Sequence, residues 1–272
     1  MISDVLLVLG CGVLAAALRT SQNPLLFRAG TLGIVVTSFL AGWMIGESVV
    51  LGVLFASTWF LLPWLEILTR VRRMRLPIER RLESSAPPTR ATFPMFGELT
   101  EEMEAAGFVY AEDVGWSHDE TKQFFRLFQN PDAGTLGTIS LVEQNEFAFF
   151  YVTITSKTSD GRVFLTWNYP FSYGLRLPPK FALNRMSGGQ SIAEMCGGHA
   201  AFLVASGVES SVLRAPDSEV LRVEMQHELR EQLDHNLACG LLERDGPDLI
   251  RYSKRGMFFL WFQFLRDFVR LS

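Results

Sequence analysis

Two apolar stretches decide the fold, AGTLGIVVTSFLAGWMIG at residues 29–46 and VVLGVLFASTWFLLPWL at residues 49–65. Neither stretch contains a charged side chain, and each is close to the length that crosses the hydrocarbon core of a bilayer as a helix. One helix through both would be about 60 Å long, twice the thickness of that core. The chain must therefore turn at Gly46-Glu47-Ser48. The two stretches predict a tight helical hairpin in a membrane.

A shorter apolar run, residues 5–18, precedes the hairpin. Its length suits a signal-peptide core, a re-entrant segment or a short span. Ala15-Ala16-Ala17 resembles a cleavage site, but the residues ahead of the run include Asp4 and no Lys or Arg, which is unlike a signal peptide. We therefore expect three short membrane helices, at about residues 3–18, 29–46 and 49–68, with cleavage of the first as the alternative.

Basic residues predict the orientation of these spans. Arg19 and Arg28 flank the first loop, whereas Glu47 stands alone in the second. Arginines then follow the third span, at Arg70, Arg72, Arg73, Arg75, Arg80 and Arg81. Under the positive-inside rule the first loop and the chain after Leu68 lie in the cytoplasm, whereas the N-terminus and Glu47 lie outside. The sequence predicts an inner or cytoplasmic membrane protein, with Arg70, Arg72, Arg73 and Arg75 at the membrane interface.

The charge distribution separates this membrane region, residues 1–68, from the rest of the chain. The protein has 272 residues, 25 basic and 29 acidic side chains, and a net charge of −4. Only five of these charged residues precede residue 69. No basic excess remains to attract nucleic acid, which we do not expect as a partner. We interpret residues 69–92 as a basic juxtamembrane helix, reaching residue 83, followed by a Pro-containing linker.

Residues 93–256 have the pattern of a soluble α+β domain with an antiparallel β-meander. A short helix is predicted at 97–106, and strands at 108–114, 122–129, 135–143, 146–157 and 162–167. The turns between them, including Gln144-Asn145 and Ser159-Asp160-Gly161, are too short for parallel crossovers. An irregular Pro-rich stretch, 169–187, separates the strands from helices predicted at 191–206 and 217–239, the latter with Asp217 as its N-cap.

Residues 237–256 resemble the closing helix and wing of winged-helix domains. The stretch has a helix that ends at Gly240, a strand Leu241-Leu242-Glu243-Arg244, and a return to Ser253 and Gly256. This resemblance implies a membrane-anchored regulator that reads DNA. The candidate recognition helix, residues 224–234, is rich in acidic residues, however, and DNA phosphates would repel it.

The last segment, residues 257–272, is predicted to form an aromatic amphipathic helix. Trp261, Phe262 and Phe268 recur at helical spacing, and basic residues flank them. Such a helix either completes the core of the domain or lies in the cytoplasmic membrane interface.

Two side-chain groups are candidate sites. Trp116 and His118 lie in a predicted loop with the acidic residues Glu112, Asp113, Asp119 and Glu120. Cys196 and His199 share one face of a predicted helix and could act as nucleophile and base, although core packing explains them better. His227-Glu228 lacks the second histidine of a zinc-protease motif because Glu231 stands in its place. Ser187-Gly188-Gly189-Gln190 matches part of the ABC-ATPase signature loop, but no phosphate-binding loop accompanies it. No cofactor or metal is predicted.

These observations favour a non-catalytic subunit or scaffold of a membrane assembly. Its partners would be the lipid bilayer and a protein, or a second copy of the chain, bound through the membrane helices or the α+β domain. One alternative is a membrane-tethered enzyme or small-ligand-binding domain that uses the candidate residues above. A second alternative is a membrane-anchored winged-helix-like regulator.

Overall fold

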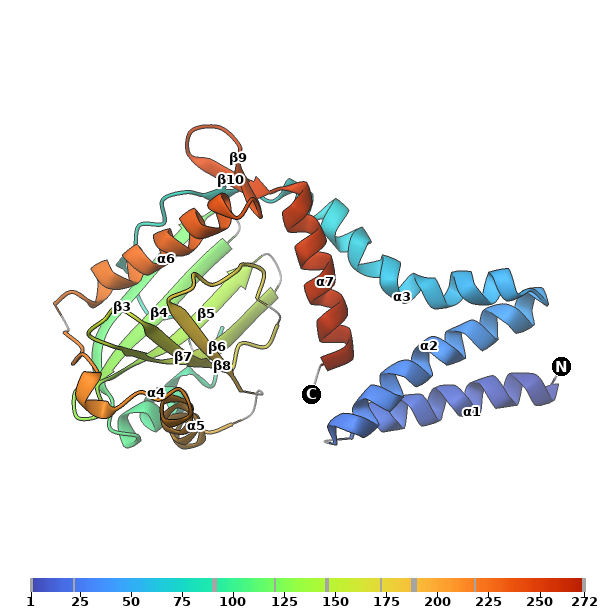
Figure 1. Ribbon diagram of the computed structural model, residues 1–272, viewed down its shortest axis with the longest axis horizontal. Coiled ribbons are helices and arrows are strands. Elements are labelled where there is room, and N and C mark those ends of the chain that lie inside the picture. Colours follow the sequence, from blue (N-terminus) through green and yellow to red (C-terminus); the bar gives the residue numbers. More distant parts are fainter. Residues whose placement is uncertain are drawn as a thin grey trace. The chain divides into compact units, whose positions relative to one another are not determined.

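The structure, a computed structural model, divides the chain into two compact units. One comprises residues 1–74 and 251–272, here called the helical unit, and the other comprises residues 75–250, here called the α+β unit. Figure 1 shows the elements of both. The residues that the structure describes are 2–21, 23–89, 92–119, 121–144, 147–171, 173–186, 190–217 and 219–270.

The helical unit contains α1 (Ile2–Arg19), α2 (Pro24–Gly46), α3 (Val49–Thr69) and α7 (Lys254–Arg270). The start of α2 is specified locally, because the Asn23 side chain accepts a hydrogen bond from the Leu25 amide and proline occupies the first helical position. The helix ends at Gly46, and the next residue, Glu47, has a left-handed φ of 45°. The turn between α2 and α3 therefore lies where the sequence predicts it.

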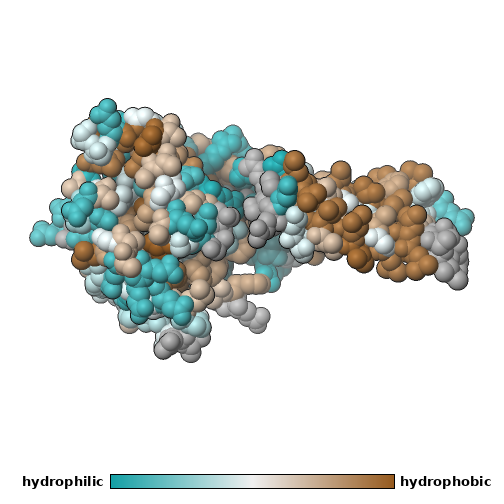
Figure 2. All heavy atoms as spheres, turned by 90° about the horizontal axis from the view of Figure 1, so that it is seen from below, coloured by the Kyte–Doolittle hydropathy of each residue, from teal (hydrophilic) through white to brown (hydrophobic). Residues whose placement is uncertain are grey.

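Two helices of this unit, over Leu25–Gly46 and Val49–Arg73, are long and apolar enough to cross a membrane, whereas α1 is a shorter apolar helix. Their large apolar side chains face outward, with Ile45 75% and Val50 68% exposed. Figure 2 shows these hydrophobic residues in brown over the helices. The part of the chain that the structure describes thus has two candidate membrane helices where the sequence predicts three spans.

Small residues form the contacts between these helices. Gly30 faces α1 so closely that a Cβ atom on it would lie 2.7 Å from the Ala15 carbonyl oxygen. Gly42 is similarly placed, 2.6 Å from the Leu51 carbonyl oxygen by the same measure. Such residues let helix backbones approach each other where lipid supplies no hydrophobic driving force. The small-residue pattern therefore serves contacts within the chain.

The α+β unit is built on a mixed seven-stranded sheet in the order β2-β3-β4-β5-β6-β7-β8. The pairs from β2 to β7 are antiparallel, as the meander predicts, and β8 joins β7 in parallel. The strands are β2 (Glu83–Ser84), β3 (Val109–His118), β4 (Thr121–Asn130), β5 (Thr135–Gln144), β6 (Phe147–Lys157), β7 (Val163–Trp167) and β8 (Phe181–Arg185). The prediction missed β8, which lies in the Pro-rich stretch. Asn145, in one predicted turn, lies outside the described residues.

Helices cover both faces of this sheet (Figure 1). On one face, α4 (Phe96–Ala105) and α5 (Ile192–Ala205) pack on a core that includes Phe128 and Ile139. On the other, α6 (Leu221–Ala238) packs Leu221 and Leu229 on Phe125. Alternate residues of β4 therefore enter opposite cores, as the side-chain period of a strand requires.

The prediction of a juxtamembrane helix reaching residue 83 is wrong beyond residue 73. After α3 a single 3-10 turn, Val71–Arg73, leads into β1 (Leu76–Pro77), which pairs with β10 (Leu249–Tyr252). β9 (Leu242–Arg244) completes this three-stranded sheet. Pro77 lacks the amide hydrogen that a continuing helix needs, while β10 offers strand partners. Arg90 and Ala91 of the predicted linker lie outside the described residues.

Two further expectations about α6 need correction. The helix begins after Val220 without a side-chain cap, and Asp217 instead accepts a hydrogen bond from the Glu219 amide in the preceding turn. The winged-helix resemblance holds for the helix followed by a hairpin, but α6 packs on the seven-stranded sheet. The buried residues of the helix begin at Leu221, which packs against the sheet.

Candidate functional site

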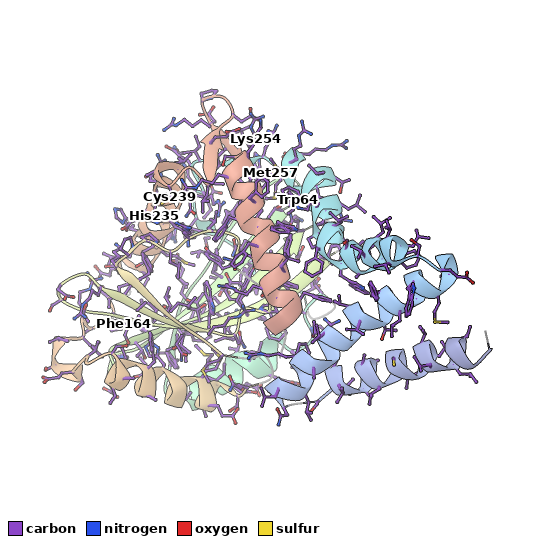
Figure 3. All side chains as sticks on the ribbon, turned by 45° about the vertical axis from the view of Figure 1, so that its right-hand side comes forward. Trp64, Phe164, His235, Cys239, Lys254 and Met257 are labelled. Atoms are coloured by element: carbon purple, nitrogen blue, oxygen red, sulfur yellow. The ribbon has the colours of Figure 1, made fainter. Side chains whose placement is uncertain are left out.

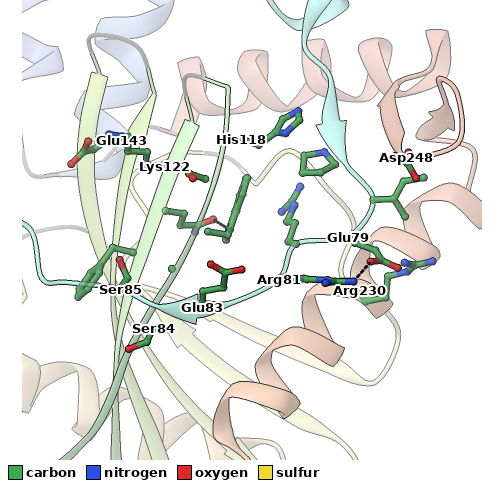
Figure 4. Close-up of a pocket in the computed structure, with 18 of the residues that line it drawn as sticks. Glu79, Arg81, Glu83, Ser84, Ser85, His118, Lys122, Glu143, Arg230 and Asp248 are labelled. Carbon is green, nitrogen blue, oxygen red and sulfur yellow. Dashed lines mark hydrogen bonds and ion pairs between the residues drawn. The ribbon is translucent and has the colours of Figure 1, made fainter.

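An open groove of about 850 Å³ lies at one end of the α+β unit (Figure 4). Its lining comes from segments far apart in the sequence: residues 77–88, the adjacent ends of β3, β4 and β5, one residue of α6, and the β9–β10 hairpin. The strand register brings the β3–β4 and β5–β6 turns to the same end of the sheet, since Thr121 pairs with both His118 and Gln144.

The groove contains both residues of the first candidate site, Trp116 and His118. They lie on β3 and not in a loop, so the loop prediction is wrong; the turn begins only at Asp119, and Glu120 lies outside the described residues. The Trp116 Nε1 donates to Gln123 Oε1 at 3.1 Å, and the Arg80 guanidinium lies 4.8 Å from the indole centroid. The indole is therefore held in place at the edge of the sheet.

A hydrogen-bonded chain continues from this tryptophan beneath α6. Gln123 Nε2 donates to the Tyr151 hydroxyl at 3.3 Å, and burial raises the pKa of that phenol. A second half-buried tyrosine, Tyr173, donates to Gln232 Oε1 of α6 at 2.6 Å, and removal of its phenol from water likewise raises its pKa. Both hydroxyl groups therefore stay protonated at neutral pH and support the sheet beside the groove.

Charges of both signs line the groove. Arg81 and Glu79 form an exposed ion pair of 3.7 Å, which Figure 4 shows together with Lys122, Glu143 and Asp248. Exposed ion pairs contribute little to stability, about 0–1 kcal/mol, so they can exchange for pairs with a ligand at low cost. The lining thus offers a ligand charges of both signs.

The second candidate pair, Cys196 and His199, lies on α5 and faces the core. His199 is 2% exposed, with Nδ1 2.9 Å from Thr166 Oγ1 and Nε2 3.0 Å from Ser156 Oγ. Burial lowers the pKa of His199 to about 4, so the imidazole is neutral at pH 7. One of its nitrogens donates to a hydroxyl and the other accepts from one, which joins α5 to β6 and β7.

The Cys196 thiol is not the hydrogen-bond partner of the His199 imidazole. The Cys196 side chain packs against the apolar core under α4 and α5. Burial raises the pKa of its thiol, so the nucleophilic thiolate is disfavoured. Both ring nitrogens of His199 are already hydrogen-bonded to hydroxyl groups. The two residues thus contribute to packing and to a buried polar link.

The residues predicted at the membrane interface fall into two groups, the arginines after α3 and the aromatic residues of α7. Arg70 pairs with Glu66 at 3.4 Å, Arg75 pairs with Asp245 of the β9–β10 loop, and the exposed Arg72 and Arg73 lie in the 3-10 turn. The aromatic members lie on α7. Trp261 and Phe268 contact the other helices of the helical unit, and Phe262 is 59% exposed.

Three acidic residues of α6 form ion pairs with lysines of the α+β unit. Lys157 of β6 lies 2.7 Å from Glu224 and 2.5 Å from Glu228, and Lys180 lies 2.5 Å from Glu231. Burial opposes ionisation of Glu224, but the hydrogen bonds and charges of Lys157 and Arg214 together outweigh it and lower the pKa of that carboxyl. The acid-rich face therefore attaches α6 to the sheet.

Sequence reasoning missed two polar pairs. Arg126 makes a two-pronged ion pair with Asp113, at 2.9 and 2.8 Å, which the register of β3 and β4 creates. Its guanidinium also bonds Thr100 of α4. On α6, the Cys239 sulfur lies 3.5 Å from His235 Nε2 (labelled in Figure 3). Their i,i+4 spacing is the only sequence signal for this second pair.

Among the described residues, no group of three or more His, Cys, Asp or Glu side chains could hold a metal ion. Ser187, Gly188 and Gly189, which match part of the ABC signature loop, lie outside the described residues. Comparison with protein-family models, with curated proteins and with solved structures gave no match.

Proposed function

We propose that this chain is an integral membrane protein whose helices anchor a cytoplasmic α+β interaction module, and that it acts as a non-catalytic subunit or scaffold. One observation carries the membrane assignment. The large side chains of the hairpin are left outside the fold, with Leu61 59%, Leu65 63% and Val50 68% exposed. An apolar surface of this kind is unfavourable in water and favourable in lipid.

The proposed topology has three spans, with the N-terminus outside. Arg19, Arg28 and Arg72 lie at one end of the antiparallel helices, and Glu47 lies at the opposite turn. Since basic loops stay in the cytoplasm, that end faces inward. The 18 residues of α1 extend about 27 Å, close to the thickness of the hydrocarbon core, and support a short third span.

The α+β unit supports binding over catalysis. His199 and Cys196 are tied into a filled core, whereas the groove is open, charged with both signs and edged by a fixed tryptophan. A protein partner, or a second copy of the chain, matches this lining. A small-ligand-binding domain is the second candidate, favoured by the position of Trp116 and His118 in the same groove.

Cysteine labelling in intact cells tests the topology. In a background without Cys11, Cys196 and Cys239, Glu47→Cys should react with an impermeant maleimide added outside. Ser85→Cys should react only after the membrane is permeabilised. Labelling of Ser85→Cys in intact cells would overturn the orientation.

Purification in a mild detergent tests the interaction role. We expect the protein to elute as a complex or oligomer whose mass falls when Arg81 and Lys122 are both changed to Glu. A control with Val204→Ala, an exposed α5 residue outside the groove, should leave the mass unchanged. Elution of the unaltered protein as a lone monomer would contradict the proposal.

A further inference from the structure

The last helix, α7, belongs to the helical unit although 176 residues of the α+β unit separate it from α3. Aromatic contacts attach it to α3. The Trp64 ring lies 4.9 Å from Phe258 and 6.0 Å from Trp261, and Trp261 Nε1 donates to the Phe60 carbonyl at 2.8 Å. Figure 3 shows Trp64 pointing toward the first half of α7.

The far end of α7 reaches the loop between α1 and α2. Phe268 stacks on Trp59 at 5.4 Å, and the Arg19 guanidinium lies 4.9 Å from the Phe268 ring and 5.6 Å from Phe27. Arg19 is the last residue of α1. The helix therefore runs along the basic end of the helical unit.

These contacts set the depth of α7 along α3. Trp64 is five residues before Thr69, where α3 ends, and Trp59 is ten residues before it, which is about 8 Å and about 15 Å along the axis. The hydrocarbon core is about 30 Å thick, so Trp64 lies in the half next to the basic residues, whereas Trp59 lies near the middle of the core. The indole ring of Trp64 favours its position because one edge is polar.

Two aromatic side chains of α7 stay largely exposed, although one of them, Phe258, lies against Trp64 of α3. Phe258 is 61% and Phe262 is 59% exposed, and they share a face one turn apart. The neighbouring surface of α3 is equally apolar, with Leu65 63% and Leu68 49% exposed. Both helices therefore present exposed apolar side chains.

The polar residues of α7 exclude a fourth span. Lys254 and Arg255 are exposed at its start, and Gln263, Arg266 and Asp267 interrupt its second half. Charged side chains in the middle of a bilayer are costly, whereas a helix with separate apolar and basic faces is stable in the interface. The occupant that fits this surface is therefore the cytoplasmic leaflet, with anionic headgroups near Lys254 and Arg255.

We propose that α7 is a second membrane anchor that inserts Phe258 and Phe262 into the cytoplasmic lipid interface while Trp59, Trp64 and Trp261 hold it on α3. The inference rests on the proposed membrane insertion of α2 and α3. It makes the α+β unit an insertion between two membrane-bound helices. Both ends of the α+β unit are then attached to the bilayer. The proposed interaction role does not by itself require this second attachment.

Fluorophore depth tests this anchor in the full chain, reconstituted in vesicles of phosphatidylcholine and phosphatidylglycerol. In the cysteine-free background, an environment-sensitive dye is placed at Phe262→Cys and, separately, at Phe258→Cys. Leu62→Cys on α3 and Val223→Cys on α6, which are 52% and 67% exposed, serve as lipid and water controls. Lipids brominated near the headgroup end of the acyl chain should quench both α7 positions at least twofold more than Val223→Cys.

The possible outcomes separate the two proposals. If Leu62→Cys is quenched but either α7 position is not, the α7 anchor is overturned and the membrane hairpin stays intact. No quenching at Leu62→Cys would overturn the membrane assignment itself. Phe258→Cys keeps Phe262, and Phe262→Cys keeps Phe258, so each variant retains one proposed anchor residue. Circular dichroism checks that each variant is folded. The dye at Phe262→Cys should also move outward when Lys254 and Arg255 are both changed to Glu.

Discussion

The helical unit and the α+β unit distribute large and small side chains in opposite ways. In the helical unit glycines occupy the helix contacts, as at Gly30 and Gly42, and residues such as Val50 face outward. In the α+β unit Phe125 and Phe128 are buried, 2% and 0% exposed, between the sheet and its helices. This difference is what the proposed membrane position of the helical unit would produce, because apolar burial stabilises a fold only where water is the alternative.

The largest effect that tests this comparison is expected at the core of the α+β unit. Phe128→Ala removes a fully buried ring and should lower the free energy of unfolding by about 4 kcal/mol. Phe171, 52% exposed, is the matched control, and Phe171→Ala should cost less than about 1 kcal/mol. Denaturant unfolding of the full protein in detergent measures both. Equal losses would show that this core is not packed as described.

The next effect concerns the buried imidazole. Because the pKa of His199 falls from 6.5 to about 4 on folding, the unfolded chain binds this proton at a higher pH than the native chain does. Stability present above pH 6.5 should therefore be lost as the pH falls toward 4, by about 3 kcal/mol in total.

Unfolding experiments at pH 7 and pH 4.5 on the native protein and on His199→Gln measure this contribution. The variant should be less stable at pH 7, because it disturbs the bonds to Thr166 and Ser156, but its stability should fall less on acidification. Parallel losses in the two proteins would show that His199 does not titrate as proposed.

In the helical unit, replacing a small residue at a helix contact should reduce stability, just as removing a large buried residue does in the α+β unit. Gly30→Val places atoms against the Ala15 carbonyl and should destabilise the packing of α1 on α2 by about 2 kcal/mol. A Cβ atom on Gly10 would meet nothing within 4 Å, so Gly10→Val should be nearly neutral. Thermal unfolding in detergent, or cross-linking between α1 and α2, distinguishes the two variants.

The smallest effect is expected at the turn between α2 and α3. Glu47 has a φ of 45°, a left-handed conformation that costs a residue with a Cβ atom about 1 kcal/mol. Glu47→Gly should raise the thermal stability of the helical unit slightly, by under about 1 kcal/mol. Glu47→Val should lower it, since a β-branched residue fits this conformation worst. The reverse order would contradict the described turn.

The elements predictable from the sequence are those with local causes. The meander follows from alternating apolar strands and short turns such as Asp160-Gly161, where Gly161 adopts a φ of 85° and its amide bonds the Thr158 carbonyl. The turn at Glu47 follows from the length of the apolar stretches on either side. Neither requires knowledge of distant residues.

The candidate site was only partly predictable. Trp116 and His118 do line the groove, but the other walls come from residues 77–88 and from the β9–β10 hairpin. Two-residue strands such as β1 carry no periodic signal, and Leu76 pairs with Ile250, a partner 174 residues away. The ion pairs of the acidic α6 face were likewise unpredictable, because Lys157 and Lys180 are remote in the sequence.

The sequence by itself therefore determined the apolar helices, the turn between α2 and α3, and the antiparallel meander, because hydrophobic periodicity, span length and turn chemistry act over a few residues. Only the tertiary structure decided the parallel strand β8, the groove, the hydrogen-bond partners of His199 and the return of α7 to α3. Each of these depends on contacts between distant segments, and such contacts form only when the whole chain has folded.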